Sequence, residues 1–122
     1  MAGDAGGGEV WETICETICE PGVQVCETGF GAGHSAVTWL ASNAGARVVA
    51  FDLGTLPGAA VGERFVGARF PGRLELVRGD SSWTVAEYVG EHPGLVCDVV
   101  HVDGGHFDFV PWNDLTELTR WP

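Results

Sequence analysis

The chain has 122 residues, of which 45% are hydrophobic, and a formal net charge of −11. This length suits one domain, and the hydrophobic fraction argues against wholesale disorder. All six cationic residues are arginines, against seventeen acids, so the sequence excludes a strongly basic surface for nucleic acid or anionic membrane. No apolar run approaches the roughly 18 residues of a membrane span. We therefore expect neither nucleic-acid nor membrane partners.

Residues 1–8 are rich in Gly and Ala and lack an apolar core. They predict a flexible tail rather than a secretory signal, which leaves 9–122 as a single domain. The first half of this domain predicts a helix, a strand, a second helix and a second strand. Apolar residues recur every four positions in the first helix. The predicted ranges are a helix over 9–20, a strand over 23–27, a glycine-rich turn over 29–33, a helix over 35–42 and a strand over 47–51.

The second half continues the alternation after a loop over 53–58. Ser81 or Ser82 can cap the helix that begins there. The predicted ranges are a helix over 61–68, a strand over 74–77, a turn over 79–81, a helix over 81–90, a strand over 96–102 and a helix over 111–120. Continuously apolar strands separated by helices are typical of a parallel sheet covered on both faces. The fold class predicted from this pattern is α/β.

The four cysteines, at positions 15, 19, 26 and 97, match no paired zinc motif. Cys15 and Cys19 would share one face of the first helix, where they either pack as small apolar side chains or form a metal clip or redox pair. We favour packing, because free cysteine is usually buried as a small hydrophobe. Reduced thiols fit an intracellular compartment, so we expect a cytoplasmic protein.

Every predicted strand ends in an acid or a glycine turn. The residues are Glu27-Thr28-Gly29, Asp52, Gly79-Asp80 and Asp103-Gly104. In a parallel sheet these ends lie along one edge, where ligands bind. Gly29-Phe30-Gly31-Ala32-Gly33 also follows a strand and opens a helix, as a nucleotide-binding loop does. The dinucleotide fingerprint needs Gly or Ala at the position of His34, so nicotinamide binding is the weaker interpretation.

Together these segments resemble the class I S-adenosylmethionine-dependent methyltransferases. Residues 25–35 resemble the family's first motif, with an acid two positions before three alternating glycines. Asp52 matches the ribose-binding acid, Gly79-Asp80-Ser81 matches the adenine loop, and residues 98–106 match the motif at the fourth strand. The last stretch is similar to the methyltransferase domain 24 and macrocin-type O-methyltransferases. The resemblance covers residues 21–115.

The resemblance implies a Rossmann-like three-layer sandwich with strand order 3-2-1-4. It also implies a fragment of the larger family sheet, or a partner or second copy that covers the open sheet edge. The expected cofactor is S-adenosylmethionine, and the expected acceptor is a small molecule, methylated at a hydroxyl. The residues that the resemblance assigns to the cofactor are Glu27, Gly29, Phe30, Gly31, Gly33, Ser35, Asp52, Leu53, Asp80, Ser81 and Asp103.

Asp103 and His106 are the catalytic residues that the resemblance implies. Asp103 matches the position of a Mg²⁺ ligand in metal-dependent relatives, and His106 could act as the base that deprotonates a hydroxyl. Alternatively, His106 and Asp108 only orient their loop. We interpret His101 as a satisfied residue of the sheet, and the tryptophans Trp39, Trp83 and Trp112 as packing residues, although Trp83 could instead flank the adenine. His34 could line the cofactor or cap the start of its helix.

Two other functions are compatible with the sequence. One is a noncatalytic module that binds a cofactor or nucleotide and regulates a partner. The other is a fragment of a nicotinamide-dependent oxidoreductase, in which Asp52 would also bind ribose.

Overall fold

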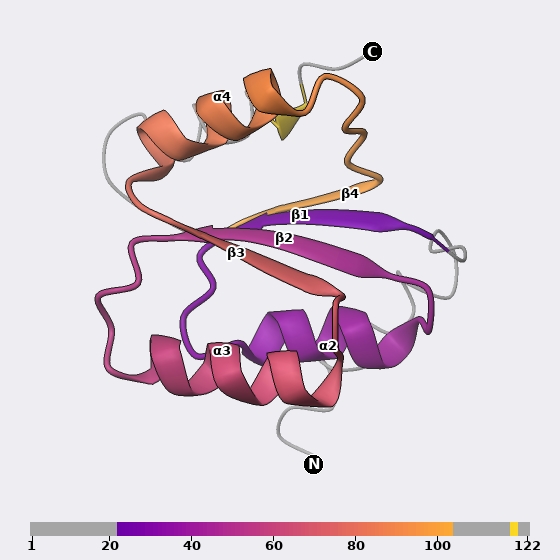
Figure 1. Cartoon of the computed structure of the whole chain (residues 1–122), viewed down its shortest axis with the longest axis vertical. Helices are drawn as coiled ribbons and strands as arrows, with labels where there is room; N and C mark the ends of the chain where they lie inside the picture. Colours follow the sequence, from indigo (N-terminus) through magenta and orange to yellow (C-terminus); the bar gives the residue numbers. More distant parts are fainter. Residues whose placement is uncertain (1–21, 104–117, 120–122) are drawn as a thin grey trace.

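The computed structural model describes residues 22–103 and 118–119 (Figure 1). The four strands are β1 (Gln24–Thr28), β2 (Arg47–Asp52), β3 (Leu74–Arg78) and β4 (Val99–Val102). The three helices between them are α2 (His34–Ser42), α3 (Gly58–Arg69) and α4 (Ser81–Glu91). The strands form one parallel sheet in the order β3-β2-β1-β4. The predicted α/β class and strand order are confirmed.

Some predictions concern segments outside the described residues. These are the tail over 1–8, the helix over 9–20, Cys15, Cys19, His106, Asp108, Trp112 and all but the two described residues of the helix over 111–120. In the part of the chain that the structure describes, no helix has the length and apolarity needed to cross a membrane.

Helices cover both faces of the sheet, with α2 and α3 on one face and α4 on the other (Figure 1). Successive residues of β2 point to opposite faces. Val48 and Ala50 belong to one core with Trp39 of α2, whereas Val49 and Phe51 belong to the core beneath α4. Burial on both faces is the reason that this strand is continuously apolar.

The last strand is shorter than predicted, because β4 begins at Val99 and not at 96. Asp98 explains this start. Its backbone N–H donates to the carbonyl of Gln24, and its carboxylate accepts the backbone N–H of Gln24 at 2.8 Å. The parallel ladder then runs from Val25 opposite Val99, and the residues before Asp98 lead away from it.

Cys26 and Cys97 form a disulfide, with 5.6 Å between their Cα atoms. The expectation of reduced thiols is therefore wrong for this pair. Cys26 lies in β1 opposite Val100, whereas Cys97 lies outside the ladder, just before β4, and packs with Cys26 in the core beneath α4. Disulfides persist mainly in oxidising compartments. The predicted cytoplasmic location therefore loses the support that reduced thiols gave it, and it stays a prediction.

Two local predictions are also corrected. The N-cap of α4 is Asp80, whose carboxylate accepts the N–H of Ser82 at 2.9 Å, and not Ser81 or Ser82. An aspartate is a stronger N-cap than most residues and completes the same turn one position earlier. Trp39 is buried as predicted, but Trp83 is 72% exposed because it lies on the solvent side of the first turn of α4.

Candidate ligand-binding site

A cavity of about 690 Å³ lies at the carboxyl ends of the strands. Its wall combines the loops that follow all four strands with the first turn of α2. The lining residues are Thr28, Gly29, Phe30, Gly31, Ala32, His34, Ser35, Phe51, Asp52, Leu53, Thr55, Leu56, Gly79, Asp80, Ser81 and Asp103. The structure thus brings together nine of the eleven residues assigned to the cofactor, and Glu27 and Gly33 lie behind this wall.

Asp52 connects two loops of the cavity wall. Its Oδ2 accepts the N–H of Gly31 at 3.0 Å, and its Oδ1 accepts the N–H of Gly54 at 2.7 Å. A carboxylate oxygen can accept more than one hydrogen bond. The two backbone donors therefore orient the carboxylate and still leave it able to accept hydroxyl groups from a ligand.

The glycine-rich loop runs close to the end of β2. Gly29 donates its N–H to the carbonyl of Phe51 at 2.8 Å. Gly29, Gly31 and Gly33 have φ angles of 90°, 57° and 95°, values that residues with a side chain rarely adopt. Gly33 is also closely packed, since a Cβ atom there would lie 3.0 Å from the ring of Phe30. The alternating glycines are therefore needed for the shape of the loop, which presents backbone to the cavity.

Asp80 both caps α4 and lines the cavity. Its Oδ1 caps α4 through Ser82, while its Oδ2 accepts none of the described hydrogen bonds. Side chains of Asp80 and Ser81 line the cavity next to Gly79. This part of the wall can accept a hydrogen bond from an amino group of a ligand.

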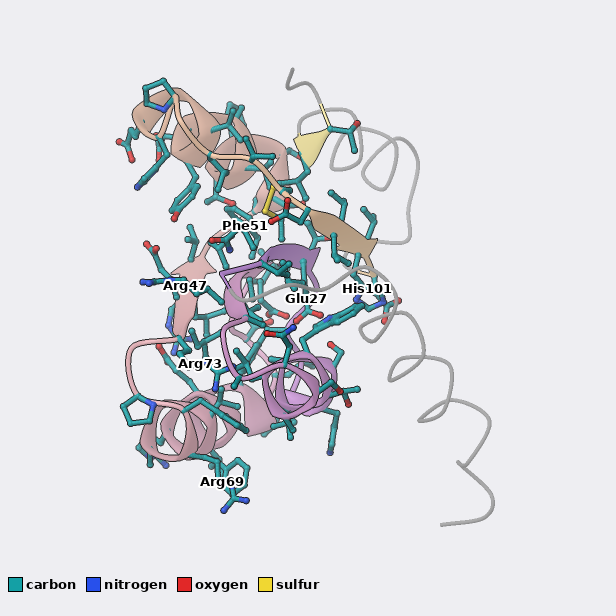
Figure 2. All side chains as sticks on the ribbon, turned by 90° about the vertical axis from the view of Figure 1, so that its right-hand side faces the viewer. Glu27, Arg47, Phe51, Arg69, Arg73 and His101 are labelled. Atoms are coloured by element: carbon teal, nitrogen blue, oxygen red, sulfur yellow. A yellow bond between two sulfur atoms is a disulfide. The ribbon has the colours of Figure 1, made fainter. Side chains whose placement is uncertain are left out.

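Glu27 is fully buried behind the cavity, where it joins β1, α2 and β4 (Figure 2). Its Oε1 accepts the hydroxyl of Ser35 at 2.6 Å and lies 3.1 Å from Nδ1 of the half-buried His101. The hydrogen bond with Glu27 raises the pKa of His101, and partial burial opposes this rise. The other oxygen, Oε2, is buried without a hydrogen-bond partner. The buried negative charge is thus only partly compensated.

The residues do not fit a Mg²⁺ site in the described part of the chain. Asp103 lines the cavity, but no group of three acidic, His or Cys side chains there could hold a metal ion. Mg²⁺ is held by several oxygen ligands around one point. We therefore assign no step to a metal, and His106 lies outside the described residues.

The charges of the cavity wall all have one sign. Asp52, Asp80 and Asp103 line it, and none of the arginines among the described residues does. Arg78 is the last residue of β3 and therefore lies near Asp80 in the sequence. Its guanidinium forms a salt bridge with Glu63 of α3. The cavity therefore favours a cationic or neutral ligand over a phosphorylated one.

Sequence reasoning missed several lining residues, among them Thr28, Thr55 and Leu56. It considered His34 only as a residue that lines the cofactor or caps a helix, and the structure places it in the wall. Thr28 could have been found, because it ends β1 beside Glu27. Thr55 and Leu56 carry no such signal, since a loop's path is set by its tertiary contacts.

No protein-family model and no curated protein matches this sequence. Two solved structures of the calicheamicin-biosynthesis enzyme CalS11 do match. The apo structure, described as a TDP-rhamnose 3'-O-methyltransferase, aligns with a TM-score of 0.79 at 21% identity over 97% of this chain. The second, described as a calicheamicin methyltransferase, aligns with a TM-score of 0.69 at 20% identity over 96% of this chain. This chain spans 59% of the length of each. It shares the fold of these methyltransferase structures.

Proposed function

We propose that the chain is the cofactor-binding part of an S-adenosylmethionine-dependent methyltransferase whose acceptor is a hydroxyl group of a small molecule. The observation that carries this proposal is the composition of the cavity wall. Three carboxylates and a glycine-rich loop meet at the carboxyl ends of the parallel strands, and no arginine among the described residues lines the cavity. The shared fold with CalS11 supports the same function.

The charge of the ligand separates this proposal from nicotinamide binding. S-adenosylmethionine carries a sulfonium and an ammonium group, which carboxylates attract, and it has no phosphate. Asp52 would bind the ribose of a dinucleotide too, but the pyrophosphate would then lie in a cavity lined by carboxylates, and none of the described arginines lines that cavity to neutralise it. Like charges at close range in a partly buried site destabilise such a complex. The wall therefore favours the methyl donor.

The described residues suggest a binding mode. Asp52 accepts the ribose hydroxyls, Asp80 accepts the adenine amino group through Oδ2, and the backbone of Gly29 and Gly31 faces the methionine part. Glu27 contributes negative charge near the ammonium group from behind the wall. In this binding mode, most ligand contacts come from loops that follow β1, β2 and β3.

When bound, S-adenosylmethionine supplies a methyl group on a positively charged sulfur. In the transfer the carbon–sulfur bond breaks as the oxygen–carbon bond forms, and the hydroxyl proton passes to a base. Asp103 lines the cavity and is the described candidate for that base, with His106 as the other candidate. The chain's main contribution is alignment, which can supply about 7–11 kcal/mol of a barrier. CalS11 is described as a TDP-rhamnose 3'-O-methyltransferase, and methylation at a sugar oxygen supports a hydroxyl acceptor.

The direct test compares two ligands on the purified chain. S-adenosylhomocysteine at about 100 times its Kd should add about 2.7 kcal/mol to the free energy of unfolding, and NAD⁺ at the same concentration should add nothing measurable. Calorimetry should show heat only for the first ligand. Stabilisation by NAD⁺ alone would refute the proposal.

A second experiment addresses the noncatalytic alternative. The chain is incubated with S-adenosylmethionine labelled in the methyl group and with TDP-rhamnose as a trial acceptor. Transfer of label to the sugar nucleotide rules out a purely regulatory module. Binding of S-adenosylhomocysteine without transfer to this or other hydroxyl acceptors favours that alternative.

A further inference from the structure

We propose that Gly62 of α3 is a positioning residue that fixes the glycine-rich loop in its ligand-binding shape. This inference rests on the proposed function only for the ligand used in one of its tests. Gly62 lies outside the cavity wall and outside every motif in the sequence. Its role follows from what α3 contacts.

Gly62 is buried where α3 meets the loop. A Cβ atom at this position would lie 2.0 Å from the carbonyl oxygen of Ala32 and 2.5 Å from its carbonyl carbon. The atoms in the way belong to backbone, which cannot rotate aside as the end of a side chain can. Any larger residue at position 62 must therefore move either α3 or the loop.

The same face of α3 follows the loop over two further turns. One turn earlier, a Cβ atom at Gly58 would lie 3.2 Å from Cβ of Ala32. One turn later, Val66 is fully buried, and its Cγ2 would lie 3.2 Å from a Cβ atom at Gly33. The helix thus supports the loop from Ala32 to Gly33.

Asp52 holds the loop as well, through the N–H of Gly31. Asp52 also holds Gly54, which lies in the segment that leads into α3. The loop, Asp52, this segment and α3 therefore form a closed circuit of contacts around one wall of the cavity. A displacement at Gly62 is transmitted to the amide groups that face the ligand.

Glycine is a poor helix former, but at position 62 packing opposes any larger residue. Glycine in a helix interior costs about 1 kcal/mol relative to alanine, so Gly62→Ala would stabilise α3 if packing did not oppose it. Gly67 lies in the same helix, and a Cβ atom there would meet nothing within 4 Å. Gly67→Ala is therefore the matched control, because it makes the same chemical change without touching the loop.

The first test measures S-adenosylhomocysteine affinity by calorimetry on the folded full chain, well below each variant's thermal midpoint. We expect Gly62→Ala to weaken binding by about tenfold or more, which corresponds to about 1.4 kcal/mol, and Gly67→Ala to leave it unchanged. Val89→Ala, which removes buried volume beneath α4, controls for general destabilisation. Wild-type affinity in folded Gly62→Ala would overturn the proposal.

The second test needs no ligand. Amide ¹H–¹⁵N spectra should show shifted signals for residues 29–33 and 54 in Gly62→Ala and unshifted signals for these residues in Gly67→Ala. Unshifted loop signals in Gly62→Ala would overturn the proposal. If the wild-type chain fails to bind S-adenosylhomocysteine, the proposed function fails, while these spectra still decide the role of Gly62.

A milder variant covers the case in which Gly62→Ala does not fold. Gly58→Ala would place its Cβ atom 3.2 Å from Cβ of Ala32 and at an ordinary contact distance of 3.8 Å from its Cα, so Ala32→Gly in the same chain removes the close contact. We expect Gly58→Ala to shift the loop signals and the double variant to restore them. Loop signals that Gly58→Ala leaves unchanged would contradict support of the loop by α3.

Discussion

Nδ1 of His101 lies 3.1 Å from Oε1 of Glu27, a carboxylate that has no exposed surface. The two residues lie directly opposite each other in the parallel ladder of β1 and β4. Each is therefore held by the strand backbone, and their contact does not depend on loop geometry. The pair connects the residues behind the cavity wall to β4, which is one of the two outer strands of the described sheet.

This pair predicts a pH dependence of stability. Glu27 raises the pKa of His101 above its ordinary value of 6.5. A raised pKa in the folded state means that the folded chain holds this proton more tightly than the unfolded chain does. The stabilisation is therefore fully present below pH 6.5 and is lost as the pH rises through the higher folded value.

The measurement is the free energy of unfolding against pH for the wild type and for His101→Gln. The difference between the two curves isolates the pair from the chain's other titrating groups. We expect the advantage of the wild type to shrink as the pH rises above 6.5. An advantage that grows with pH would contradict the assigned hydrogen bond.

Asp52→Asn should weaken both the fold and ligand binding. The amide nitrogen of Asn would face the N–H of Gly31 or Gly54, so one backbone donor loses its acceptor, at a cost of about 1–3 kcal/mol. Asp98→Asn is the control, because Asp98 also accepts a backbone N–H but lies before β4, away from the cavity. Denaturant unfolding should show this loss for Asp52→Asn and a smaller one for Asp98→Asn, whose amide oxygen can still accept the N–H of Gln24. Calorimetry should show a loss of S-adenosylhomocysteine affinity for Asp52→Asn alone. Equal affinities in the two variants would argue against Asp52 as a ligand contact.

Reduction of the disulfide between Cys26 and Cys97 should destabilise the chain strongly. The two cysteines are 71 residues apart, and closing a loop of that size restricts the unfolded chain by about 4 kcal/mol. Thermal unfolding with and without dithiothreitol measures this effect. The double variant Cys26→Ala and Cys97→Ala should resemble the reduced wild type and should not respond to the reductant through this pair. An unchanged midpoint of the wild type on reduction would refute the bond.

The chain's single tyrosine, Tyr88, should titrate late. Partial burial and the hydrogen bond that it donates to Glu75 at 2.8 Å raise its pKa from 10.0 to about 12. Absorbance at the phenolate band reports this residue alone, because tryptophan does not ionise there. Glu75→Gln removes the charge and should lower the pKa toward 10.0. A wild-type midpoint near 10.0 in the folded chain would show that the contact does not form.

Much of the sheet could be predicted from the sequence because its signals are local. The continuously apolar strand over 47–51 needs burial on both faces, and only a parallel sheet between helices provides it. The acid or glycine turn after each strand marks the carboxyl edge of the sheet, because parallel strands all end at that edge and ligands bind there. These two patterns predicted the parallel sheet and its ligand-binding edge, whereas the strand order and the individual cofactor residues were implied by the resemblance to the class I methyltransferases.

The features that were missed depend on contacts between distant residues. The disulfide between Cys26 and Cys97 depends on how the residues before β4 pack against β1 beneath α4, which no residue spacing encodes. Gly62 looks like an unfavourable residue in a helix until its distance to Ala32 is known. Trp83 was predicted to pack, because an aromatic side chain on a helix usually does, but it is exposed. The orientation of α4 decides which face of the helix is covered, and the sequence does not show that orientation.

Strand β2 carries opposite charges at its two ends. β2 begins with Arg47 and ends with Asp52, and Arg73, just before β3, donates to the carbonyls of Leu40 and Ala46 at that same first end. At the other end of the strands, three aspartates and none of the described arginines line the cavity, and Arg78 at the end of β3 is paired with Glu63. A cation that approaches from solution is drawn to the end that holds the cavity, so its association rate should fall as salt screens that field.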